Sequence, residues 1–136
     1  MGRFEVATLS LLRIVAGLLF FCPGAMKLLG WFGGMPAGFH LTPLLTTAGA
    51  IELAAGTLIL LGLFTRPAAF LASGEMAFAY FISHFPRGFW PIVNHGEPAV
   101  LFCFLFLYLS ARGAGPFSLD AIRARPRAGN ARSGPA

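Results

Sequence analysis

Four apolar runs divide the chain, separated by short stretches rich in glycine, proline and polar residues. They cover residues 9–29, 46–64, 67–84 and 97–111. About 20 apolar residues in helical conformation cross the hydrocarbon core of a bilayer, so the first run has this length and the fourth is short for a span. The pattern predicts an all-α integral membrane protein, a four-helix bundle whose helices run up, down, up and down.

The breaks between the runs have the chemistry of membrane-interface loops and tight turns. Residues 30–43 combine glycine and proline with Trp31 and Phe32, and aromatic rings favour the interface. Proline at position 67 suits the first turn of a new helix. We predict one membrane domain over residues 1–112 and a basic tail, rich in Pro, Gly, Ala and Arg, over residues 113–136.

Composition supports the membrane assignment and argues against a soluble domain. Hydrophobic residues make up 57% of the 136 residues and charged residues 11%, whereas soluble domains carry about 25% charged residues. A chain of this size leaves much of its surface exposed and cannot bury so much apolar area in water. The net charge of +5 is concentrated after the last apolar run, where it suits anionic lipid head groups rather than nucleic acid.

The basic residues also predict an orientation. Arg3, Arg66, Arg112 and the arginines of the tail fall on one side of a four-span topology, and Lys27 and Arg87 fall on the other. Cytoplasmic loops carry the excess of lysine and arginine. We therefore predict a multi-pass protein of the inner (plasma) membrane with both termini in the cytoplasm.

Two glutamates interrupt the apolar runs. A charged residue at the centre of a spanning helix costs on the order of 3 kcal/mol. Glu52 is surrounded by small residues at positions 48, 55 and 56, which let another helix approach, so it is expected to face the protein interior beside a cation of the first run. Glu75 follows Ser73 and Gly74 in the third run and repeats this arrangement.

The first run supplies cations for both glutamates. Arg13, Gly17, Phe20, Gly24 and Lys27 are spaced four and three residues apart and share one helix face. Relative depths predict a deeper pair of Arg13 with Glu75 and a polar cluster near the outer face. The members of this cluster are Lys27, Glu52, His84, His95 and Glu97. The same groups also fit a structural reading, in which cations extend to head groups and carboxyls hold helices together.

The two cysteines do not indicate a metal site or a disulfide. Cys22 and Cys103 each lie within an apolar run, without a CxxC pair or a metal-type Cys/His spacing. Both are expected to be unbridged small hydrophobic residues.

Several longer stretches are similar to a known family. They are "LLRIVAGLLFFCPGAMKL", "IELAAGTLILLGLFTRPAA", "EMAFAYFISHFPRGFWPIVNHGEPAVLFCFLFLYL" and "GAGPFSLD". Over residues 9–120 the chain resembles the DoxX family of small bacterial four-helix membrane proteins, although His95 stands where the family usually has a second glycine. The resemblance implies a link to membrane redox systems, because DoxX-like proteins include subunits connected with thiosulfate oxidation at the quinone pool and others connected with oxidative-stress complexes.

Three functions follow from these observations. The first is a quinone-associated redox subunit, in which the outer cluster exchanges protons and phenylalanines wall the ligand site. The candidate walls are Phe20, Phe21, Phe78, Phe81, Phe102 and Phe104. The second is a non-catalytic scaffold subunit of a larger membrane complex, and the third is a small carrier or proton pathway. The sequence has no haem, flavin or iron–sulfur motif, so electrons would come from a partner; redox-complex subunits and further copies of this chain are the expected protein partners.

Overall fold

The computed structural model describes residues 2–126, and this part of the chain is helical with turns and contains no strand. Residues 2–126 form four long helices: α1 (Arg3–Leu29), α2 (Pro43–Leu61), α3 (Thr65–Ala79) and α5 (Glu97–Arg112). The short elements are η1 (Trp31–Gly33), η2 (Tyr80–His84), η3 (Phe85–Arg87), α4 (Pro91–Asn94) and α6 (Leu119–Ala124). The all-α prediction is confirmed.

Capping groups, rather than apolar residues, set the helix ends. α1 begins at Arg3, well before residue 9, because the Glu5 carboxylate accepts a hydrogen bond from the Gly2 backbone N–H at 3.0 Å. α2 begins at Pro43 because Thr42 accepts a hydrogen bond from the Leu45 N–H. It ends before Gly62, which adopts the left-handed conformation. The predicted run 46–64 is therefore displaced toward the N-terminus.

The third predicted run is interrupted in its last turn. α3 is α-helical from Thr65 to Ala79, and the chain then continues as a π-helical turn over Tyr80–His84. Turns of this kind are frequent at functional sites. The fourth predicted run agrees closely with α5.

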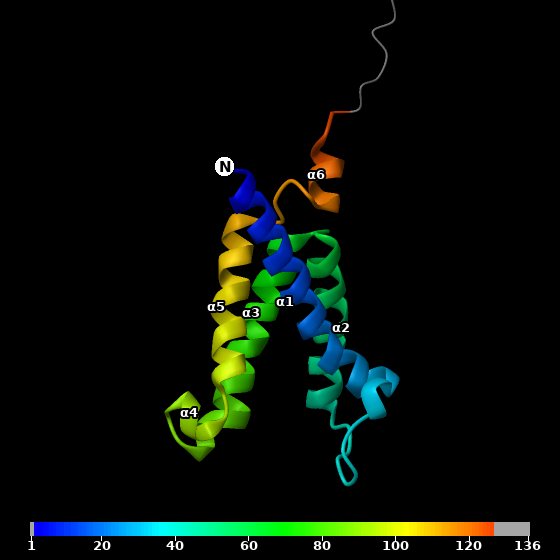
Figure 1. The fold of residues 1–136 in the computed structure, drawn as a ribbon. Coiled ribbons are helices and arrows are strands. Elements are labelled where there is room, and N and C mark those ends of the chain that lie inside the picture. The colour runs from blue at the N-terminus through cyan, green and yellow to red at the C-terminus, as the bar shows by residue number, and fades with distance from the viewer. Residues whose placement is uncertain (1, 127–136) are drawn as a thin grey trace, which may run out of the picture.

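The long helices pack as two antiparallel pairs (Figure 1). α1 packs along α2, α3 packs along α5, and α2 contacts α3. The start of α1, the end of α5 and α6 lie at one end of the molecule, whereas α4 and the loop after α1 lie at the other. The two ends of the described chain are thus on the same side.

Glycines bring α1 and α2 into close contact. A Cβ atom added to Gly17 would lie 2.6 Å from the Leu60 backbone nitrogen and 3.0 Å from the Gly56 oxygen. One added to Gly24 would lie 2.8 Å from the Gly49 oxygen. The two helices therefore touch backbone to backbone at two levels, as membrane helices with small interface residues do.

An aromatic core joins the two pairs. The ring of Phe20 on α1 is 4.8 Å from that of Phe106 and 6.3 Å from that of Phe102, both on α5. Ile59, Phe106 and Leu109 are completely buried. Most of the other buried side chains are small or polar.

Apolar side chains cover the outside of the helices. α1 and α2 are long and apolar enough to cross a membrane, with mean hydropathies of 2.0 and 1.8, and a third or less of each apolar stretch is buried. Large exposed side chains also mark α3 and α5, where Phe70 is 68%, Leu101 71% and Phe104 65% exposed.

Candidate functional site

An ion pair joins α1 and α2 inside the protein. The Lys27 Nζ donates to both carboxylate oxygens of Glu52, at 2.7 and 2.6 Å, and the two side chains are 14% and 6% exposed. Gly24 and Gly49 make room for them, because a Cβ on either would lie 2.9 Å from the Glu52 Cβ or 3.3 Å from the Lys27 Cβ, respectively. The prediction that Glu52 faces the interior beside a cation of the first helix is confirmed.

A cavity of about 270 Å³ opens beside this ion pair. All four long helices and η2 contribute to its wall. The lining residues are Leu19, Phe20, Pro23, Glu52, Met76, Ala79, His84, Pro98, Ala99 and Phe102. A carboxylate and an imidazole thus share one hollow with two phenylalanine rings, and its remaining lining is apolar.

A buried asparagine holds His84 in place. The His84 Nδ1 is 3.1 Å from the Asn94 backbone oxygen, and its ring stacks on Tyr80. Asn94 is completely buried, and its side-chain amide donates to the Tyr80 hydroxyl and to the Gly88 oxygen. The Tyr80 hydroxyl donates in turn to the Phe89 oxygen. Sequence reasoning missed Asn94, although it directly precedes His95, a member of the predicted cluster.

The other two members of the predicted cluster lie at the surface. His95 ends α4 in the left-handed conformation (φ 59°), and Glu97 opens the first turn of α5; both side chains are exposed. The turn directs Asn94 and Gly96 inward and the residues between and after them outward. The structure therefore brings Lys27, Glu52 and His84 together and leaves His95 and Glu97 outside.

The predicted pair of Arg13 with Glu75 is wrong. Arg13 is 2% exposed, and its guanidinium donates to the backbone oxygens of Ile59, Leu60 and Phe117 at 2.8, 2.5 and 2.7 Å. It therefore binds two carbonyls in the last turn of α2, where the helix ends and supplies few further N–H groups. The Ile59 oxygen also accepts from the capping Gly62 N–H at 3.1 Å. These contacts place the Arg13 guanidinium at the level of the turn between α2 and α3. Glu75 lies ten residues after the start of α3, about 15 Å further along that helix, so the two charged groups are at different depths.

Glu75 lies near the ion pair instead. It is within electrostatic range of Glu52 and Lys27. Its carboxyl group is half-buried, and the Oε2 atom is buried without a hydrogen-bond partner in the described part of the chain. Three charged side chains from α1, α2 and α3 thus gather in the half of the molecule opposite the termini.

Comparison with known proteins decides the family. The DoxX family model matches residues 8–85, more than half of the chain. An uncharacterized protein of Haemophilus influenzae is 45% identical over 123 residues, which cover 87% of this chain and 92% of the relative. This chain belongs to the DoxX family. No solved structure matched the sequence.

The match places the site within the DoxX region. Lys27, Glu52, Glu75 and His84 all fall inside residues 8–85, whereas α5 lies beyond the matched stretch. DoxX proteins are membrane-associated, which agrees with the two helices that could span a bilayer. Cys22 and Cys103 both carry free thiols.

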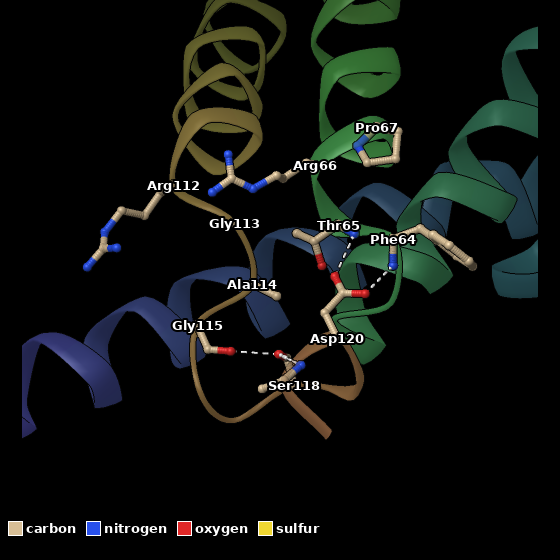
Figure 2. Close-up of a pocket in the computed structure, with 11 residues that line it drawn as sticks. Phe64, Thr65, Arg66, Pro67, Arg112, Gly113, Ala114, Gly115, Ser118 and Asp120 are labelled. Atoms are coloured by element: carbon tan, nitrogen blue, oxygen red, sulfur yellow. Dashed lines mark hydrogen bonds between the residues drawn. The ribbon is translucent and has the colours of Figure 1, made fainter. Parts of the chain in front are cut away.

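The segment after α5 ties the DoxX helices together at the opposite end (Figure 2). The Asp120 carboxylate accepts hydrogen bonds from the backbone N–H groups of Phe64 and Thr65 at 2.8 and 3.0 Å and so caps α3. Burial raises the pKa of Asp120, but these hydrogen bonds and nearby Arg123 outweigh it, so the pKa lies below its usual value. Sequence reasoning did not single out Asp120.

This segment belongs to the predicted basic tail, 113–136. Its first residues pack on the helices, because Phe117 accepts a hydrogen bond from Arg13 and the Asp120 N–H donates to the Gly62 oxygen. Ser118 caps the short helix α6, because its hydroxyl accepts a hydrogen bond from the Ala121 N–H. The Pro-, Gly- and Arg-rich end of the predicted tail, residues 127–136, lies outside the described residues.

Proposed function

We propose that this DoxX protein is a four-span inner-membrane protein that binds a quinone-type ring in its 270 Å³ cavity and serves as a subunit of a membrane redox system. One observation carries the proposal: Glu52, ion-paired with Lys27, and His84 line the same aromatic-walled cavity. Intramembrane ionisable residues that share a hollow are candidates for ligand and proton sites.

The lipid environment of all four helices is supported by their surfaces. α3 and η2 together run from residue 65 to 84, about 30 Å at helical rise, and α5 is somewhat shorter. Both expose phenylalanine and leucine side chains outward. Exposure of such an apolar surface to water is unfavourable, whereas its contact with lipid hydrocarbon chains is not.

Orientation is supported by the arginines. Arg3 opens α1, Arg66 opens α3 and Arg112 closes α5, and these three helix ends lie together (Figure 1). The positive-inside rule places this end in the cytoplasm. The cavity with Glu52 and His84 then lies in the outer half of the membrane.

Reporter fusions test this topology. An alkaline phosphatase–green fluorescent protein pair fused after residue 136 should report the cytoplasm, because the arginine-rich end is retained there. The same reporters inserted at Gly34 should report the outer side. A matched insertion in the turn at Gly62 should behave like the C-terminal fusion. Reporters at 34 and 136 on the same side would contradict the four-span topology.

The cavity has the size and chemistry for one ring. An apolar cavity of about 150 Å³ admits benzene, so about 270 Å³ accommodates a substituted ring. A quinone accepts two electrons and two protons at its carbonyl oxygens to become a quinol. Within this chain the Lys27–Glu52 pair and His84 would hold those oxygens and exchange the protons. The electrons would come from a partner subunit.

Binding measurements on single variants test the cavity. We expect Glu52→Gln and His84→Phe each to weaken binding of decylubiquinone about tenfold. The first substitution removes the charge of the carboxylate, and the second removes a hydrogen bond from the imidazole to the ligand. Gln retains the shape and polarity of Glu but does not titrate. Equilibrium dialysis of the purified protein in nanodiscs gives the dissociation constants.

Glu97→Gln is the matched control, because Glu97 is close in sequence to the cavity wall and its side chain is exposed. It should bind like the unmodified protein. Equal binding by all three variants and the unmodified protein would rule out the cavity as the quinone site. The protein would then act as a scaffold subunit, with the ion pair holding α1 to α2.

A further inference from the structure

A second hollow lies on the outside of the protein between α2 and α3. It is a groove of about 480 Å³. α2 contributes Leu44, Thr47, Ala48 and Ile51, and α3 contributes Phe70, Leu71, Gly74, Glu75 and Phe78. Among the described residues it shares no lining side chain with the cavity that contains Glu52 and His84. The groove is therefore a separate place in the fold.

Two polar side chains line this groove, and they differ in their bonding. The Thr47 hydroxyl donates to the Pro43 oxygen of its own helix at 2.8 Å. The Glu75 Oε2, in contrast, is buried and has no hydrogen-bond partner in the described part of the chain. The nearby Lys27 ammonium binds both oxygens of Glu52. A buried polar atom without a partner is costly, and such atoms are rare in folded proteins.

The rest of the groove is shaped for a hydrocarbon body. A Cβ atom added to Gly74 would meet nothing within 4 Å, so the groove is open above α3 at this point. Phe70 and Phe78 are 68% and 54% exposed and stand on either side of it along the helix. A volume of about 480 Å³ lies in the range of small-molecule sites.

We propose that the groove between α2 and α3 binds a small lipid-soluble molecule that donates a hydrogen bond, from a hydroxyl or amine group, to the Glu75 carboxyl. Neither carboxyl oxygen of Glu75 has a hydrogen-bond partner among the described residues, and Oε2 is buried, so the donor in the groove binds Oε1. The hydrocarbon part covers Gly74 and the two phenylalanines. The site does not depend on quinone binding in the inner cavity, because the two hollows have different walls.

Carbodiimide labelling in membranes tests the proposal. Dicyclohexylcarbodiimide is lipid-soluble and modifies carboxyl groups that face an apolar phase. We expect it to label Glu75, located by peptide mass mapping, and to spare Glu52, which Lys27 covers. 4-Hexylphenol should slow the labelling at least threefold. 4-Hexylanisole, which has the same apolar body but no donor, should leave the rate within a factor of 1.5.

Two variants show that the groove is responsible. Glu75→Gln should abolish the label. Gly74→Leu should slow labelling by filling the groove, and it should leave the melting temperature unchanged because its side chain enters open space.

Three results would overturn the proposal. They are the absence of label at Glu75, equal slowing by the phenol and the anisole, and disulfide-linked dimers of Gly74→Cys that are themselves refractory to the carbodiimide. The last would show that a second copy of the chain covers the groove. None of these results bears on the decylubiquinone affinities, so failure here and failure of the cavity proposal are distinguishable.

Discussion

Alanine at Gly17 or Gly56 will push α1 away from α2 and lower the free energy of unfolding by about 3 kcal/mol. The added Cβ atom would lie 2.6 Å from the Leu60 nitrogen in the first case and 2.7 Å from the Phe21 nitrogen in the second. Both targets are backbone atoms, which cannot rotate away. Overpacking a well-packed interior costs about 1–3 kcal/mol, and a clash against backbone belongs at the upper end of that range.

Unfolding by sodium dodecyl sulfate titration, followed by circular dichroism, measures this loss. Gly74→Ala is the control, since it makes the same change within a long helix where the new methyl group meets no neighbour. Alanine favours a helix over glycine by roughly 1 kcal/mol, so Gly74→Ala should be neutral or slightly stabilising. If Gly17→Ala unfolds at the same detergent fraction as Gly74→Ala, the backbone contact between α1 and α2 is not present in the membrane protein.

This helix contact shows how far sequence reasoning reaches. The stripe of Arg13, Gly17, Phe20, Gly24 and Lys27 follows from helical spacing alone, and the structure buries all of it except part of Lys27. The pairing of these glycines with those of α2 does not follow, because it depends on the register of two antiparallel helices. Register is set by contacts between residues distant in sequence, such as Gly17 with Gly56.

The polar groups likewise divide into those whose partners could be predicted from the sequence and those whose partners could not. Glu52 and Lys27 could be paired from the sequence because small neighbours marked the face of each helix. The partners of Arg13 could not, since they are backbone oxygens, one of them at Phe117 in the closing segment. Spacing likewise does not distinguish Asn94 from His95. The left-handed turn at His95 decides which of the two side chains is buried.

Removing one partner of the ion pair will destabilise the protein far more than removing both. Lys27→Met leaves the Glu52 carboxylate at 6% exposure without its ammonium. Breaking a buried pair in this way costs about 3–5 kcal/mol, whereas replacing both charges by apolar side chains of similar volume is often neutral or stabilising. We therefore expect Lys27→Met and Glu52→Leu each to lose several kcal/mol and the double variant to recover most of it.

The double variant also separates packing from ligand chemistry. Its helices keep the glycine contacts on either side of the pair, so its detergent unfolding should approach that of the parent. Its cavity no longer has the ammonium and carboxylate beside His84, so decylubiquinone should bind at least tenfold more weakly. A double variant that is as unstable as Lys27→Met would show that the two charges do not share one buried interaction. A stable double variant that binds decylubiquinone like the parent would assign the ion pair to helix packing alone, because only the ligand-binding role requires the charges themselves.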